Sequence, residues 1–322
     1  MRIIFLGTPE FAIPSLEKLL KSRHEIIAVV TQPDKPQGRG NKLTPPPVKV
    51  FAQQNNIPCY QFKKISREGV ETLASLKPDI MITAAYGQIL SQAIIDIPKH
   101  GIINIHGSIL PKYRGASPVQ TAVINGDTET GITIMQTDIG LDTGDILSVQ
   151  KTYIDENETS GDLMNRLAEL GSDLLLTTLD QIDSGEIVRI KQQHADENIT
   201  KKLKKEDCLI NWNKSSKQIK CLIMGTNPDP IARTILNGEV IKIYRAKIAE
   251  NIENDKYATP GTIIEPSSAK AGVFVQCGQG VIEILEAQFP GGKVLTGKQL
   301  FGGRKFAINM AFNPLSYPAS IE

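Results

Sequence analysis

The chain has 322 residues, of which 40% are hydrophobic and 22% are charged, and its formal net charge is +1 at pH 7. No apolar run approaches the length of about 20 residues that a membrane-spanning helix needs, so no such helix is expected. The cysteines are too widely spaced to form the short motifs of zinc or redox sites, and we expect no metal; they are Cys59, Cys208, Cys221 and Cys277.

The small net charge hides an uneven distribution. Residues 1–200 contain 19 Lys and Arg against 24 Asp and Glu, whereas residues 201–322 contain 17 against 11. A basic C-terminal part suits a polyanion such as a nucleic acid, although a surface of this size explains six surplus charges equally well. The chain is too long for one compact unit of typical size, so two domains are expected. The first residues have the pattern of a strand and not of a signal peptide, which favours the cytoplasm.

The first third of the chain alternates between strands and helices, which favours a parallel sheet. Serine is a preferred residue at the N-cap of a helix, and Ser66 is expected to cap the helix at 66–76. Gly7 is not followed by the further glycines of a dinucleotide-binding fingerprint, so no NAD site is predicted. Strands are predicted at 2–6, 26–30, 57–61 and 80–84, and helices at 14–21, 48–55, 66–76 and 91–95.

A long polar loop is predicted at residues 31–47, TQPDKPQGRGNKLTPPP. Its prolines make it stiff, and the two glycines that flank Arg39 leave the backbone free there. Cations on a semi-rigid projecting loop suit phosphate groups, and the loop carries Lys35, Arg39 and Lys42. A solvated surface loop without a ligand is the alternative interpretation.

The middle third carries the polar residues of greatest interest. A strand at 101–106 ends with Asn104 and His106, and a helix is predicted at 117–125. Two later strands are expected to pair as a hairpin across a glycine-rich turn, DIGLDTGD, at 138–145. The strands of this hairpin are predicted at 131–137 and 146–153, and the longest helix at 160–182.

The C-terminal third predicts a separate β domain. Residues 190–207 are polar and are expected to be a linker between a domain at 1–189 and another at 208–322. Five short strands separated by Gly and Pro suggest a small β-barrel. They are predicted at 231–236, 240–246, 261–265, 273–276 and 281–288, after a helix at 215–224.

Asn104, His106 and Asp142 form the strongest candidate for a catalytic site. Asn104 and His106 are two residues apart on one strand, so both side chains point to the same face. The turn between Gly140 and Gly144 can bring the carboxylate of Asp142 alongside. Amide and imidazole groups can stabilise an oxyanion that forms at an attacked carbonyl, and a carboxylate can hold the imidazole charged and relay a proton.

No serine or cysteine occupies the place of a nucleophile in this constellation, although Ser108 is close in sequence. The pattern therefore favours direct transfer between two bound substrates over a covalent intermediate. Each residue also has a simpler interpretation, because a histidine that ends a strand is often a surface residue and an aspartate in a glycine-rich turn often only shapes it.

Several strings in this order resemble the methionyl-tRNA formyltransferase family: TQPDKPQGRGNKL, AYGQIL, INIHGSILPKYRGASPVQ, NGDTETGITIMQTDIGLDTGD and TSGDLMNRLAELG. The resemblance is dense over the N-terminal two-thirds. It implies an α/β fold, with a Rossmann-like formyltransferase domain on a mostly parallel sheet, followed by a C-terminal OB-like β-barrel that binds tRNA. It also implies transfer of a formyl group from 10-formyltetrahydrofolate to the α-amino group of methionine on initiator methionyl-tRNA, for translation initiation.

The resemblance assigns roles to particular residues. It implies Asn104, His106 and Asp142 as the catalytic residues and Lys35, Arg39 and Lys42 as tRNA contacts. The string SILP matches a folate-contacting segment of the family, with one volume-conserving replacement. The folate-binding residues are accordingly Ser108, Ile109, Leu110 and Pro111.

Three alternative functions remain open. A formyltransferase acting on a sugar nucleotide or a small amine, or a formyltetrahydrofolate hydrolase, would share the three catalytic residues but has no evident need for the basic loop. A non-catalytic RNA-binding protein would keep the basic features but not the three residues together. We expect a monomer in the cytoplasm that binds no metal and no membrane.

Overall fold

The computed structural model describes residues 1–37, 40, 42–193, 199–252, 254–255 and 257–312. The chain divides into two compact units that interleave along the sequence. Unit 1 comprises Met1–Pro118, Glu129–Tyr153 and Met164–Thr200, and unit 2 comprises Val119–Thr128, Ile154–Leu163 and Lys201–Glu322. The boundaries predicted from the sequence stay a prediction.

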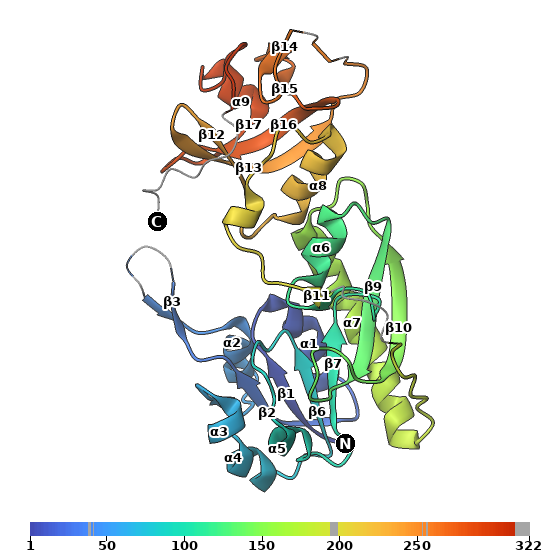
Figure 1. Cartoon of the computed structure of the whole chain (residues 1–322). Coiled ribbons are helices and arrows are strands. Elements are labelled where there is room, and N and C mark those ends of the chain that lie inside the picture. The colour runs from blue at the N-terminus through green and yellow to red at the C-terminus, as the bar shows by residue number, and fades with distance from the viewer. Residues whose placement is uncertain (38–39, 41, 194–198, 253, 256, 313–322) are drawn as a thin grey trace. The chain divides into compact units, whose positions relative to one another are not determined.

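Unit 1 is built around a seven-stranded sheet with the strand order β10-β9-β7-β6-β1-β2-β5 (Figure 1). The five strands from β7 to β5 are parallel, whereas β9 and β10 are antiparallel additions at one edge. Runs of buried Ile and Val make the parallel strands suitable for a sheet covered on both faces. The strands are β1 (Arg2–Gly7), β2 (Glu25–Thr31), β5 (Cys59–Gln61), β6 (Ile80–Ala84), β7 (Ile102–His106), β9 (Glu129–Gln136) and β10 (Ile146–Tyr153).

Helices cover both faces of this sheet (Figure 1). On one face, Lys18 of α1 bonds to Asp173 of α7, and Gly171 of α7 packs against Ile105. On the other face, the core that contains Ile102 is closed by helices α3, α4 and α5. Because side chains alternate along a strand, Asn104 and His106 share the face of Ile102. The helices of unit 1 are α1 (Ile13–Leu20), α2 (Pro47–Gln54), α3 (Ile65–Glu68), α4 (Val70–Ser75), α5 (Gln92–Ile95) and most of α7 (Ser160–Ser184). Helix α6 (Pro118–Ile124) belongs to unit 2 except for its first residue.

Two local predictions in unit 1 are wrong. The single helix expected at 66–76 is two short helices, because Gly69 ends α3 and precedes α4. Ser66 is not the cap: Lys64 occupies that position, and the Ser66 hydroxyl donates to the carbonyl oxygen of Ile89.

The region expected to be an irregular loop contains a hairpin instead. Strands β3 (Lys35–Gln37) and β4 (Lys42–Thr44) pair in antiparallel fashion. The base of the hairpin is held by Asp34, which accepts hydrogen bonds from Lys49 and Gln61. Arg39 lies outside the described residues.

Unit 2 contains a six-stranded antiparallel sheet, in which β12-β13-β16-β15-β14 are consecutive neighbours and β17 also pairs with β16. The predicted fold class is confirmed. Strand β17 and helix α9 (Gly297–Gly302) were not predicted from the sequence. The strands are β12 (Ala232–Leu236), β13 (Glu239–Ile248), β14 (Ile263–Ser268), β15 (Gly272–Gln276), β16 (Val281–Gln288) and β17 (Val294–Thr296), and helix α8 spans Ser216–Gly225.

A buried aromatic cluster organises the core of unit 2. Trp212 stacks on Phe312 with ring centroids 5.0 Å apart, and Phe306 meets Phe312 edge to face at 5.5 Å. The indole nitrogen of Trp212 donates to the hydroxyl of Thr234, at 2.9 Å.

Among the helices of the described residues, none combines the length and the apolar character needed to cross a membrane.

We predict that Thr234→Val destabilises unit 2 by about 1–3 kcal/mol, because the valine keeps the shape but leaves the buried indole N–H of Trp212 without its acceptor. Denaturant unfolding followed by tryptophan fluorescence measures this directly, since Trp212 is the single tryptophan in the chain. Thr234→Ser retains the hydroxyl and should lose less stability. Equal unfolding midpoints for the valine variant and the parent chain would contradict the prediction.

Candidate active site

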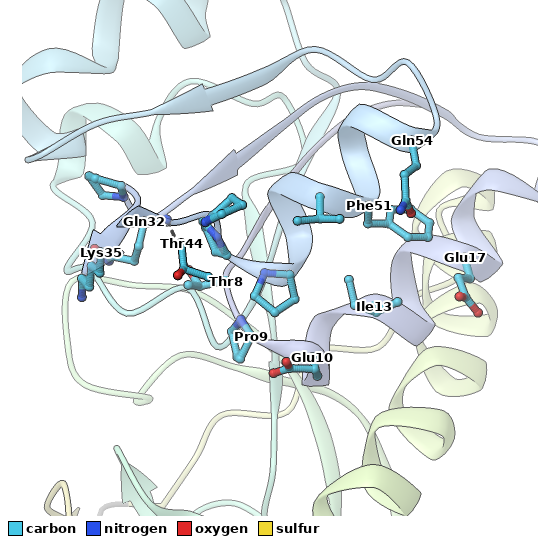
Figure 2. A pocket seen from close by; sticks show the side chains of 15 residues that line it. Thr8, Pro9, Glu10, Ile13, Glu17, Gln32, Lys35, Thr44, Phe51 and Gln54 are labelled. Carbon is cyan, nitrogen blue, oxygen red and sulfur yellow. Dashed lines mark hydrogen bonds between the residues drawn. The ribbon is translucent and has the colours of Figure 1, made fainter. Parts of the chain in front are cut away.

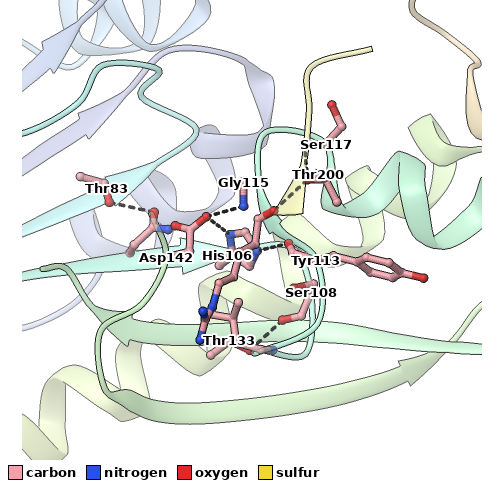
Figure 3. Close-up of polar contacts among 12 residues, drawn as sticks. Thr83, His106, Ser108, Tyr113, Gly115, Ser117, Thr133, Asp142 and Thr200 are labelled. Atoms are coloured by element: carbon pink, nitrogen blue, oxygen red, sulfur yellow. Dashed lines mark hydrogen bonds and ion pairs between the residues drawn. The ribbon is translucent and has the colours of Figure 1, made fainter. Parts of the chain in front are cut away.

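The last residue of β7, His106, lies at the centre of a network of polar contacts (Figure 3). Its Nε2 atom is 2.9 Å from the carbonyl oxygen of Tyr113. A carbonyl oxygen can only accept a hydrogen bond, so this contact assigns a proton to Nε2. The imidazole is 5% exposed, and its Nδ1 atom faces Oδ2 of Asp142 at 3.6 Å. That distance fits an ion pair and not a hydrogen bond, so Nδ1 remains able to serve a substrate atom.

Asp142 reaches His106 because the turn between β9 and β10 folds back along β7. The turn starts beside the first residue of β7, where the N–H of Thr137 donates to the carbonyl oxygen of Ile102. Asp142 then adopts a positive φ of 52°, a conformation that Asp tolerates better than most residues. Its Oδ2 atom accepts a hydrogen bond from the backbone N–H of Gly115, at 2.7 Å.

Gly144 allows this turn to close against β9. A Cβ atom at this position would lie 1.8 Å from the carbonyl oxygen of Gln136, a distance that no side chain can occupy. On the other side of the turn, the carboxylate of Asp138 accepts hydrogen bonds from the N–H of Gly140 and the hydroxyl of Thr143. The glycine-bounded turn predicted from the sequence therefore has a steric cause.

Asn104 is oriented by a residue on the neighbouring strand. The hydroxyl of Thr83, on β6, donates to Oδ1 of Asn104 at 2.8 Å, and the carbonyl oxygen of Ile103 is a more distant alternative acceptor at 3.3 Å. The shorter bond turns the amide so that Nδ2 is its free donor. Among the described residues, the Asn104 side chain has no other hydrogen bond.

The site thus offers an amide donor, an imidazole nitrogen and a carboxylate, but no thiol nucleophile. Burial raises the pKa of all four cysteine thiols, to about 11 for Cys208 and about 12 for Cys277, so they are protonated near neutral pH. The described residues contain no group of three or more His, Cys, Asp or Glu arranged to hold a metal ion. The arrangement suits stabilisation of an oxyanion together with proton movement.

The loop after β7 contains the four residues predicted to contact folate. Ser108 is 1% exposed, and its hydroxyl donates to the carbonyl oxygen of Lys112. Leu110 is also buried, and its N–H donates to the hydroxyl of Thr133. Only Ile109 and Pro111 keep partly exposed side chains. The side chains of Ser108 and Leu110 therefore shape the loop, and a ligand has access to those of Ile109 and Pro111.

The hairpin presents two of the three predicted tRNA contacts. Lys35 is opposite Thr44, and Lys42 is opposite Gln37, so the alternation of side chains puts both lysines on one face. Both are exposed. Lys49 is engaged differently, because it forms an ion pair with Asp34 at 2.8 Å and lowers the pKa of that carboxyl.

A pocket of about 670 Å³ lies between the base of the hairpin and helices α1 and α2 (Figure 2). Lys35, Gln32 and Thr8 line it together with Phe51 and several prolines. None of the three candidate catalytic residues lines this pocket. Thr8 and Gln32 also bond to the carbonyl oxygen of Tyr86 and thereby hold the loops after β1, β2 and β6 together.

The groups that orient the three residues were not predicted from the sequence. These are the hydroxyl of Thr83, the carbonyl of Tyr113, the N–H of Gly115 and the side chain of Gln192. Thr83 lies one residue before the end of the strand predicted at 80–84, so its position in the sheet was a usable signal. The two backbone groups and Gln192 carry no motif of their own.

The fold and the site together define a formyl transferase. The family model described as "Formyl transferase" matches residues 1–179, and the model "Formyl transferase, C-terminal domain" matches residues 202–305. A protein named methionyl-tRNA formyltransferase from Acetivibrio thermocellus is 46% identical over 95% of this chain and 97% of its own length. A protein of the same name from Geotalea daltonii is 45% identical over 95% and 96%. The chain belongs to the methionyl-tRNA formyltransferase family.

Solved structures share the fold at lower sequence identity. The sugar 3N-formyl transferase WlaRD, with dTDP and 5-N-formyl-THF, has a TM-score of 0.66 and 23% identity, covering 91% of this chain and 99% of that one. HypX from Aquifex aeolicus, in complex with tetrahydrofolic acid, has a TM-score of 0.64 and 15% identity, covering 100% of this chain and 50% of that one. The same fold therefore occurs in proteins with different names.

We predict that Thr83→Val lowers the turnover of formyl transfer about tenfold, the size expected for one lost hydrogen bond that orients a catalytic amide. The Asn104 amide would then be free to turn its oxygen toward the reacting carbonyl. Thr83→Ser keeps the hydroxyl and should retain most of the activity. Equal turnover in the valine and serine variants would show that Thr83 does not orient Asn104.

Proposed function

We propose that this protein transfers a formyl group from 10-formyltetrahydrofolate to the α-amino group of methionine on initiator methionyl-tRNA. The observation that carries the proposal is the joint position of Asn104, His106 and Asp142 in a chain that matches its relatives over nearly its whole length. The catalytic roles of these three residues are part of the proposal.

The reaction begins when the amino nitrogen attacks the formyl carbon. The carbonyl oxygen becomes an oxyanion, which Nδ2 of Asn104 and Nδ1 of His106 stabilise as hydrogen-bond donors. The bond between the formyl carbon and the folate nitrogen then breaks. The amine loses one proton and the folate nitrogen gains one, so no external oxidant, reductant or base is consumed. Asp142 faces the imidazole at 3.6 Å, where it can stabilise positive charge that develops on the ring and relay the proton through water.

Apolar side chains beside the site support an aromatic donor. Ile139 and Leu141 belong to the same turn as Asp142 and are 67% and 53% exposed. Large exposed apolar side chains close to catalytic groups favour a ligand with a flat apolar part, as the pterin ring of a folate has. Ile109 and Pro111 offer further partly exposed apolar surface in the loop after β7.

The basic hairpin and the residues after unit 1 support a nucleic-acid acceptor. Lys35 and Lys42 share one face of the hairpin, and Arg39 belongs to the connection between its two strands in the sequence. Exposed lysines also begin the last segment of unit 2, and among the described residues their side chains form no ion pair; they are Lys201, Lys202, Lys204 and Lys205. Such cations contribute to RNA affinity through the phosphate backbone.

Transfer to a sugar nucleotide is the second candidate, because WlaRD shares the fold. Its identity to this chain is 23%, against 46% for the relative from Acetivibrio thermocellus, so the likeness supports the fold and not the acceptor. Incubation of the protein with labelled formyl folate and either methionyl-tRNA, a dTDP-amino sugar or water alone distinguishes the candidates by the product that carries the label.

We predict that His106→Ala lowers formyl transfer to methionyl-tRNA at least about 100-fold, as expected for loss of an oxyanion donor. Folding and tRNA affinity should be retained, which thermal melting and filter binding would measure. His100→Ala is the matched control, since His100 belongs to the same unit and its side chain forms no hydrogen bond or ion pair among the described residues. Near-normal transfer by the His106 variant would refute the catalytic assignment.

We predict that replacing Lys35, Arg39 and Lys42 together by Ala raises the KM for methionyl-tRNA about tenfold or more near physiological salt. The salt dependence of kcat/KM should become shallower by about two units in log–log slope, because each lost phosphate contact removes about 0.7–0.9. Transfer to a small amine should be unchanged. Lys99→Ala changes an exposed lysine of the same unit and is the control. An unchanged KM in the triple variant would show that the hairpin does not contribute to tRNA binding.

A further inference from the structure

Gln192 is a buried glutamine whose side chain uses its full hydrogen-bonding capacity. It is 9% exposed. Its Nε2 atom donates to the carbonyl oxygens of Asp142 and Gly144, at 2.9 and 2.8 Å. Its Oε1 atom accepts two hydrogen bonds from the guanidinium of Arg114, at 3.1 and 2.7 Å. One neutral side chain therefore joins the turn that carries Asp142 to the segment that follows the loop after β7.

The segment that contains Arg114 also binds the carboxylate of Asp142. Strand β8 (Arg114–Gly115) pairs with β11 (Ile199–Thr200), and the N–H of Gly115 is the donor to Oδ2 of Asp142. The hydroxyl of Thr200 in turn donates to the carbonyl oxygen of Arg114. Gly115 has a φ of 101°, and a Cβ atom there would lie 2.4 Å from the Thr200 carbonyl oxygen, so its position is sterically defined.

The segment that carries Gln192 is fixed on the hairpin that β9 and β10 form. Ile190 and Ile146 exchange two backbone hydrogen bonds, at 2.8 and 2.9 Å, directly after the turn. Arg189 also donates to the side chain of Gln136, at 2.7 Å. Gln192 is therefore held on a defined backbone and can act as a rigid support for the turn.

The contacts of Gln192 restrict the Asp142 backbone from two sides. The carbonyl groups of Asp142 itself and of Gly144 are both tied to the same Nε2 atom. Asp142 has a positive φ, which is a less stable conformation for a residue with a side chain. Without Gln192, the turn can relax, and the carboxylate then leaves the position 3.6 Å from Nδ1 of His106.

We infer that Gln192 is a positioning residue for formyl transfer: it holds the Asp142 turn, and through it the carboxylate, against His106. The inference rests on the proposed function, because Asp142 must act in the reaction for its position to matter. Gln192 touches no reacting atom in this account. Its effect on catalysis passes through Asp142.

Glutamine fits this position better than its nearest relatives. Glutamate has the same length and still accepts from Arg114, but it has no N–H to donate to the two carbonyl oxygens. Asparagine has the same groups but is shorter by one methylene. Methionine has a similar length and offers neither donor nor acceptor of comparable strength. Gln192→Glu is consequently the sharpest variant, because it keeps the contact with Arg114 and replaces the two bonds to the turn by a carboxylate oxygen that faces two carbonyl oxygens.

The experiment measures kcat and both KM values of the full-length protein with methionyl-tRNA and 10-formyltetrahydrofolate. For Gln192→Glu we expect kcat to fall about tenfold or more, with each KM within about twofold of the parent value. Gln193→Glu makes the same chemical change at the adjacent, exposed position and should behave like the parent. Absence of transfer by the parent protein would overturn the proposed function before any variant is compared.

A double-mutant cycle with Asp142→Asn tests whether the effect passes through Asp142. Single-turnover measurements with excess enzyme give the residual rates. We expect Gln192→Glu to cost less than about twofold when Asp142 is already replaced. An additive loss, or normal kcat in the single variant, would overturn the inference while leaving the proposed function intact. Gln192→Met serves as the second variant, and failure of both to fold would assign Gln192 a role in folding instead.

Discussion

The hydrogen bond from the Gly115 N–H to the Asp142 carboxylate is the contact on which the geometry of the site depends. It holds Oδ2 facing Nδ1 of His106, while the carbonyl of Tyr113 holds the opposite ring nitrogen. Both ends of the bond belong to residues with positive φ, 101° for Gly115 and 52° for Asp142. Backbone in such conformations persists only where the surrounding structure determines it, and here several buried contacts do so.

Three segments that are distant in sequence provide those contacts. The loop after β7 supplies the N–H, the turn between β9 and β10 supplies the carboxylate, and Gln192 and strand β11 tie the first two together. The turn is attached beside Ile102 but places Asp142 next to His106, four positions further along β7. A turn that folds back over this length needs lateral support, which the N–H of Gly115 and the side chain of Gln192 provide. This explains why so many polar groups outside the sheet converge on one carboxylate.

The sequence predicted the regular parts of this structure and the residues that bear distinctive chemistry. Alternation along β7 put Asn104 and His106 on one face, and the glycines around Asp142 indicated a turn. The hairpin at 35–44 and the break at Gly69 were missed. A proline-rich polar stretch can be an irregular loop or a hairpin, and a glycine inside a helical pattern can either be accommodated or end the helix. Gln192 acts through Asp142 and Arg114, which lie 50 and 78 positions away, and no local pattern distinguishes it from other polar residues. For Thr83, the signal was its place near the end of a predicted strand.

The sequence around Gln192 shows why polarity alone is a poor guide to solvent exposure. Its composition is that of a linker, yet Gln192 is buried with two donors and two acceptor contacts satisfied. Burial of a polar amide is costly unless its groups are paired, so a fully paired buried glutamine is a specific structural device. An apolar residue in its place would leave two carbonyl oxygens and a guanidinium without their partner. The fully paired Gln192 side chain therefore stabilises one geometry of the turn, and that geometry keeps Asp142 beside His106.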